Sequence, residues 1–162
     1  MRSSPSLSPR AATLMGFFAV LVGGLVALHA FGLLTGTPPR DAPPWVIVLG
    51  GLVLVLGGAA LIVGYALAGG AAPDGDLPPG TPRWIRILQL GLGLGMVGSL
   101  GTIFGWIAFG PGPRAFTVTG SFGRGTASEV EGRTLFGAGT VLIALFFVAL
   151  LVVGLRRLRG RR

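Results

Sequence analysis

Four long apolar segments, separated by breaks rich in proline and glycine, limit what this 162-residue chain can fold into. They cover residues 11–34, 45–70, 84–110 and 135–155. A helix of about 20 apolar residues crosses a hydrocarbon core of roughly 30 Å, and each segment reaches that length. The first segment exceeds the apolar region of a signal peptide, roughly 7–15 residues, so we interpret it as a retained anchor. The sequence predicts an all-α fold, an integral membrane four-helix bundle in which residues 1–162 form a single membrane domain.

The composition favours a membrane environment. Hydrophobic residues make up 51% of the chain and charged residues 11%, whereas soluble domains carry about 25% charged residues. The net charge of +8 raises nucleic acid as a partner, but the basic residues lie in loops and tails and form no basic amphipathic element. We therefore expect no nucleic-acid partner. The chain has no cysteine, which excludes disulfides, thiolate nucleophiles and iron–sulfur ligation.

The distribution of arginines predicts that the N- and C-termini are both cytoplasmic. This orientation puts nine arginines on the inner side and four on the outer side, as the positive-inside rule requires. The inner set is Arg2, Arg10, Arg83, Arg86, Arg156, Arg157, Arg159, Arg161 and Arg162, and the outer set is Arg40, Arg114, Arg124 and Arg133. We expect the basic C-terminal tail, residues 156–162, to attract anionic lipid headgroups by about 1 kcal/mol per arginine.

The 30 glycines of the chain predict close helix packing. Residues 93–98 match the GxGxxG pattern of dinucleotide-binding turns, but no strand precedes them and no acidic residue follows before Glu129. Helical spacing instead places small residues on one face of each of the first three spans, where backbones can approach closely in lipid. The predicted helix-packing positions are Gly16, Gly23, Gly50, Gly57, Gly64, Gly91, Gly95, Gly98, Thr102 and Gly105. The fourth span is bulky on every side and is expected to face lipid or to pack through large side chains.

Polar residues within the spans are candidate functional groups. His29 has two readings: an interfacial histidine bonded to a neighbouring carbonyl, or a ligand to haem or pigment shared with another chain. We expect Arg86 to extend its guanidinium to the headgroups, and Gln89 to bond across to another helix, as Tyr65, Ser99 and Thr102 could also do. No aspartate, glutamate or lysine lies within a span, and no acid–base pair suitable for catalysis is visible. We therefore expect no enzymatic activity, no cofactor and no metal.

The outer loop, residues 111–134, is predicted to form a short β-hairpin. Residues 115–122 alternate in the manner of a strand, and residues 123–125 can turn the chain. Arg114 and Arg133 flank this loop, and either of them could pair with Glu129 or Glu131. The alternative is that the loop is a docking surface for a partner.

Residues 106–116, WIAFGPGPRAF, and residues 132–137, GRTLFG, carry a resemblance to a known group. They resemble the W-x-A-F-G-P-G outer-loop motif of small four-span proteobacterial inner-membrane proteins, which often have an acidic residue at the position of Pro113. The resemblance implies a multi-pass protein of the bacterial inner (cytoplasmic) membrane. It implies no activity, cofactor or catalytic residue.

Two functions follow from these patterns. The first is a non-enzymatic accessory or assembly subunit of a larger inner-membrane complex, whose partners are other membrane subunits or further copies of this chain. The alternative is a small oligomeric transporter or channel, in which backbone groups line the path. The small-residue faces favour both, and the scarcity of reactive side chains favours the first.

Overall fold

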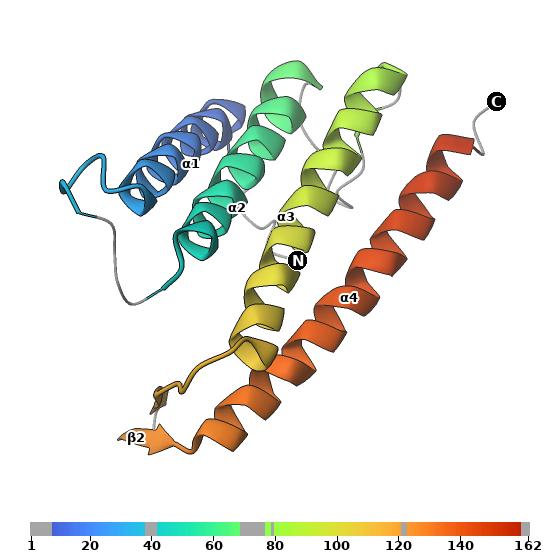
Figure 1. The fold of residues 1–162 in the computed structure, drawn as a ribbon. Helices are drawn as coiled ribbons and strands as arrows, with labels where there is room; N and C mark the ends of the chain where they lie inside the picture. The colour runs from blue at the N-terminus through green and yellow to red at the C-terminus, as the bar shows by residue number, and fades with distance from the viewer. Residues whose placement is uncertain (1–7, 38–41, 69–76, 79, 121–122, 160–162) are drawn as a thin grey trace.

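Four helices dominate the computed structural model, which describes residues 8–37, 42–68, 77–78, 80–120 and 123–159 (Figure 1). They are α1 (Pro9–Ala30), α2 (Pro44–Ile62) with its π-helical continuation η1 (Val63–Leu67), α3 (Arg83–Phe109) and α4 (Glu129–Arg159). Each of the four, α2 and η1 counting as one, is long and apolar enough to cross a membrane. The predicted all-helical fold is confirmed, with four helices long and apolar enough to span a membrane, as in a multi-pass membrane protein.

Local sequence explains where the first helix begins and ends. The Ser8 hydroxyl accepts a hydrogen bond from the Ala11 amide at 3.2 Å, and Pro9 occupies the first helical position. The helix stops at Ala30 rather than at the predicted residue 34, because Gly32 adopts a φ of 71°. The Gly32 and Leu33 amides then donate to the carbonyls of His29 and Leu28, which closes the helix in a Schellman motif.

The fourth helix begins at Glu129 rather than at the predicted residue 135. Ser128 and Glu131 form a capping box: the Ser128 amide donates to Glu131 Oε2 at 2.9 Å, and the Glu131 amide donates to Ser128 Oγ at 3.2 Å. The last part of the predicted outer loop is therefore helical, and the helix also continues through Arg159 into the predicted tail. A helix of 31 residues is about 46 Å long, so its two ends extend beyond a hydrocarbon core.

The helices pack in sequence order, α1 on α2, α2 on α3 and α3 on α4. Figure 1 shows them as an open row in which each helix runs antiparallel to its neighbour. The start of α1 and the end of α4 lie at one end of this row, called the terminal end here. The opposite end, called the hairpin end, holds β1 (Phe116–Gly120) and β2 (Gly123–Ala127), which pair antiparallel with Phe116 opposite Ala127.

The helices bury few side chains between them. Among the described residues, no large side chain is fully buried, and the core consists of small contributions such as Ala12, Val63 and Val97. Large apolar side chains point outward instead, with Phe18 69% and Leu142 66% exposed. Lipid tails solvate such surfaces without the penalty that water would impose, so this burial pattern suits a membrane and not an aqueous solvent.

Candidate functional site

The closest helix contact in the chain joins α1 to α2 through two reciprocal pairs of glycines. A Cβ atom built on Gly23 would lie 2.5 Å from the Gly51 carbonyl oxygen, and one built on Gly51 would lie 2.5 Å from the Gly23 carbonyl oxygen. Gly16 and Gly58 oppose each other in the same way, with 2.7 Å between a Cβ on Gly16 and the Gly58 oxygen. Because the pairs are seven residues apart on both helices, the two backbones touch along two turns. Any side chain at these four positions would force the helices apart.

The face that α2 turns toward α1 is one residue out of step with the predicted packing positions Gly50, Gly57 and Gly64. Gly51 and Gly58 make the contact, whereas no atom of a described residue lies within 4 Å of a Cβ on Gly50, so the packing role of Gly50 stays a prediction. Gly57 faces α3, with the Met96 sulfur 3.4 Å from its Cβ position. Gly64 also turns toward α3, with the Gln89 amide nitrogen 3.8 Å away. A one-residue step moves a helical side chain by about 100°, which separates these two faces of α2.

The predicted small-residue face of α3 divides between two neighbours. A Cβ on Gly95 would meet Leu56 of α2 at 2.9 Å, whereas Gly98 and Gly105 face Phe147 and Thr140 of α4, each at 3.6 Å. A Cβ on Gly91 meets no atom within 4 Å, so none of the described residues is the packing partner predicted for it.

The hydroxyl groups of α3 bond within their own helix and not across to another one. Ser99 Oγ donates to the Gly95 carbonyl at 2.8 Å, and Thr102 Oγ1 donates to the Gly98 carbonyl at 2.9 Å. The interhelical bonds considered for Ser99 and Thr102 are therefore absent. Such bonds to the carbonyl four residues earlier satisfy a hydroxyl that has no water to bond in lipid.

Among the described polar side chains within the spans, Gln89 has a buried oxygen without a hydrogen-bond donor. Its Oε1 atom is buried and accepts no hydrogen bond from any described residue, so the predicted bond to another helix is not made. Its amide lies against η1, where the Ala68 amide donates to the Val63 carbonyl five residues earlier. His29 and Arg86 are both partly exposed, and no hydrogen bond or ion pair joins either side chain to another described residue. Their predicted roles stay predictions.

Arg133 ties the end of α3 to the start of α4. Its Nε donates to Glu129 Oε1 at 2.9 Å, its Nη1 to the carbonyls of Ala108 at 3.3 Å and Gly110 at 3.0 Å, and its Nη2 to Gly112 at 2.6 Å. The last carbonyls of a helix lack partners and carry the negative end of its dipole, so a guanidinium there satisfies both requirements. The structure thus contains one of the considered ion pairs, Arg133 with Glu129, and gives Arg133 a cap role that sequence analysis missed.

Glu131 does not pair with an arginine but caps α4, as described above. The hydrogen bonds from the Ser128 amide and hydroxyl lower the pKa of the Glu131 carboxyl below its ordinary value. This residue lies in the first turn of α4, ahead of the apolar segment that begins at residue 135.

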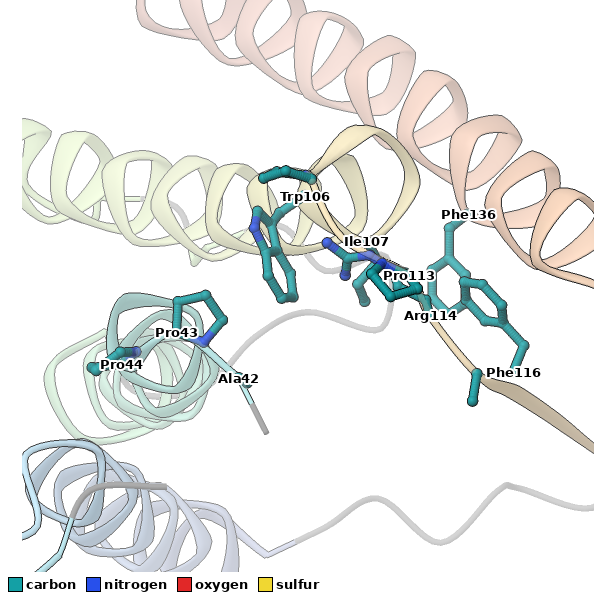
Figure 2. Close-up of a pocket in the computed structure, with 11 residues that line it drawn as sticks. Ala42, Pro43, Pro44, Trp106, Ile107, Pro113, Arg114, Phe116 and Phe136 are labelled. Carbon is teal, nitrogen blue, oxygen red and sulfur yellow. The ribbon is translucent and has the colours of Figure 1, made fainter. Parts of the chain in front are cut away.

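Arg114 makes none of the predicted ion pairs and lies instead on an aromatic surface. Its guanidinium carbon is 3.8 Å from the centre of the Trp106 ring, and Trp106 packs edge-on against Trp45 with 5.7 Å between ring centres. Figure 2 shows the Arg114 side chain reaching from the loop after α3 toward Trp106, with the start of α2 on the other side. Nε and Nη2 of Arg114 are buried and have no acceptor among the described residues.

Arg114 and Trp106 line a shallow groove of about 870 Å³ at the hairpin end, between the start of α2 and the loop after α3. Its walls are mainly proline and aromatic side chains. The lining residues are Ala42, Pro43, Pro44, Trp106, Ile107, Pro111, Pro113, Arg114, Ala115, Phe116 and Phe136. An apolar groove with one cation is suited to bind an amphiphile that carries a negative charge.

Comparisons with models of protein families, with curated proteins and with solved structures gave no match to this chain. Among the residues that the structure describes, no three histidine or acidic side chains are grouped as a metal ion would require. The geometry of the chain itself is therefore the basis for any functional proposal.

Proposed function

We propose that this protein is a non-enzymatic accessory or assembly subunit of a larger complex in the bacterial inner membrane. The observation that supports this proposal best is a set of helical glycines that face none of the other residues that the structure describes. A Cβ built on any of four helical positions meets no atom within 4 Å: Gly24, Gly50, Gly91 and Gly93.

A glycine on a lipid-facing helix surface brings cost without benefit. It weakens a helix by roughly 0.5–1 kcal/mol relative to alanine and offers acyl chains less contact surface than a larger side chain. At a contact between helices the same glycine lets two backbones approach, as Gly23 and Gly51 do within this chain. The uncovered glycines therefore favour contacts with helices of other chains.

The open arrangement of the helices leaves room for such contacts. α1 and α4 lie at the two edges of the row, and each packs mainly on one neighbour, α2 and α3 respectively (Figure 1). The apolar part of α4 has no buried residue at all. A membrane partner could therefore pack against either edge or either broad face without displacing a helix of this chain.

Purification from native membranes in a mild detergent, with and without cross-linking, tests the proposal. We expect co-elution with at least one membrane protein, and we expect Gly91→Leu to weaken it because that side chain would occupy the contact surface. Leu142→Phe on exposed α4 is the matched control, because it also adds volume to an exposed surface but lies away from the four uncovered glycines. A protein that elutes alone, with no cross-linked partner, would contradict the proposal.

One observation favours the alternative of a small oligomeric transporter. Gln89 has an unpartnered side-chain oxygen, and its amide nitrogen lies beside the π-helical turn η1; such turns are frequent at functional sites. Flux into liposomes that Gln89→Leu abolishes, while the protein still inserts and folds, would favour transport over the accessory role.

A further inference from the structure

We propose that the groove at the hairpin end binds one anionic phospholipid, with the lipid phosphate at Arg114 and an acyl chain along the apolar wall. Arg114 carries a positive charge that no described acidic group compensates. No carboxylate among the described residues lies within ion-pair distance of its guanidinium, because Glu129 is engaged by Arg133 and Glu131 by Ser128. Within the protein, the charge of Arg114 is stabilised by a cation–π contact with the Trp106 ring.

The orientation of the guanidinium decides which part of it a ligand can reach. Nε and Nη2 are enclosed by the protein, and Gly110 lies so close that its Cβ position is 2.6 Å from Nη2. The third nitrogen, Nη1, is not one of these enclosed atoms, and Arg114 lines the groove. Contact with the Trp106 ring, whose centre is 3.8 Å from the guanidinium carbon, holds the group in place, so a phosphate oxygen meets a donor that is already positioned.

The position of the groove indicates where the anion comes from. Trp45 opens α2 and Trp106 lies in the last turn of α3, so this edge-on pair marks the boundary between apolar helix and polar loop. Tryptophan is enriched at this depth in membranes, where lipid phosphates also lie. A free inorganic anion would fit the charge of the groove but not its wall of Ile107, Phe116 and Phe136. A phospholipid fits both.

This site differs from the basic C-terminal tail, because α4 carries the described part of that tail, residues 156–159, to the opposite end of the row (Figure 1). Arginines at the tail are expected to attract the whole headgroup layer without a defined geometry. The groove combines a fixed cation with an apolar wall, and it should therefore hold a single lipid long enough to survive purification.

Native mass spectrometry of the full chain in an uncharged detergent tests the proposal, with phosphatidylglycerol, phosphatidylcholine and inorganic phosphate as separate probes. We expect one tightly bound phosphatidylglycerol, about tenfold weaker binding in Arg114→Gln, and unchanged binding at this site in Arg156→Gln at the terminal end. Arg114→Lys should retain part of the affinity, because it keeps the charge and loses the stacked plane.

A second variant keeps the test valid if Arg114→Gln fails to fold. Ala115→Phe fills the groove from its exposed rim and leaves Arg114 in place, so it should also weaken phosphatidylglycerol binding while the helix content by circular dichroism stays unchanged. Equal binding by wild type, Arg114→Gln and Ala115→Phe would overturn the proposal. Binding of inorganic phosphate that displaces phosphatidylglycerol completely would overturn the assignment to a lipid.

Discussion

Gly23 and Gly24 are adjacent in α1 but have opposite surroundings, and replacing each with alanine gives a sharp test of the contact between α1 and α2. A Cβ on Gly23 would lie 2.5 Å from the Gly51 carbonyl oxygen and 2.9 Å from the Val55 amide nitrogen, whereas a Cβ on Gly24 meets nothing within 4 Å. Ordinary van der Waals contact begins near 3.4 Å, so Gly23→Ala requires the backbones to part by 0.9 Å, the difference between 3.4 and 2.5 Å.

The cost follows from what holds these helices together. In lipid they associate through dispersion contacts and not through burial from water, and a gap of roughly 0.5–1 Å removes a quarter to a half of such attraction. We expect Gly23→Ala to lower the free energy of unfolding by about 1–3 kcal/mol. Gly24→Ala should leave it unchanged or raise it by up to about 1 kcal/mol, because alanine favours the helix over glycine.

Unfolding in mixed micelles by increasing fractions of dodecyl sulfate, followed by circular dichroism, measures both values. The adjacent glycines of α2 repeat the comparison, since Gly51→Ala should destabilise the protein and Gly50→Ala should not. Equal losses for Gly23→Ala and Gly24→Ala, or a neutral Gly23→Ala, would show that the α1–α2 contact does not depend on these backbones touching.

Three further perturbations test the hairpin end. Arg133→Ala should destabilise the protein by about 2–3 kcal/mol, because the carbonyls at the end of α3 lose a charged donor. Arg133→Lys should recover part of this loss. Faster hydrogen exchange confined to residues near Gly110 would verify the cause. Ser128→Ala should unwind the first turn of α4, because it removes the hydroxyl of the capping box. Acidification should have the same effect, because the pKa of Glu131 is lowered in the folded state. The stabilisation from Glu131 is therefore present near neutral pH and is lost as the pH falls through that pKa. A helix content that does not change with pH between neutral and acid would contradict this. Trp45→Ala should shift the fluorescence of Trp106 and cost about 1 kcal/mol from the lost ring contact, whereas Trp84→Ala at the terminal end should leave the emission of Trp106 unchanged.

Much of the fold can be predicted from the sequence, because lipid imposes simple requirements on the length and hydropathy of a helix that crosses it. Apolar segments of more than 20 residues and the prolines between them locate four helices to within a few residues. The boundaries that sequence analysis missed depend on local chemistry: the positive φ of Gly32 ends α1 early, and the pattern Ser-x-x-Glu at residues 128–131 starts α4 early. The second of these signals is visible in the sequence as a capping box ahead of an apolar run.

The site was less predictable, because it depends on how helices are rotated against each other. The pairs Gly50–Gly51 and Gly57–Gly58 offer α2 two adjacent faces, and composition does not show which of them meets α1. Tertiary packing selects Gly51 and Gly58. The cluster of Trp45, Trp106 and Arg114 joins residues far apart in the sequence, and no local pattern could indicate it. Arg133 is spaced four residues from Glu129, which predicts their ion pair but not its bonds to the end of α3.

Every proposal here depends on the four helices crossing a membrane, and labelling of single cysteines in intact cells tests this most directly. The natural chain has no cysteine, so each variant carries one reactive thiol for a membrane-impermeant maleimide. We expect Thr126→Cys in the hairpin to react from outside the cell, and Ser8→Cys ahead of α1 to react only after lysis. Leu145→Cys in α4 should stay unreacted in both cases, although the protein leaves that side chain 63% exposed. Reaction of Leu145→Cys as fast as that of Thr126→Cys would place α4 in water and contradict the account.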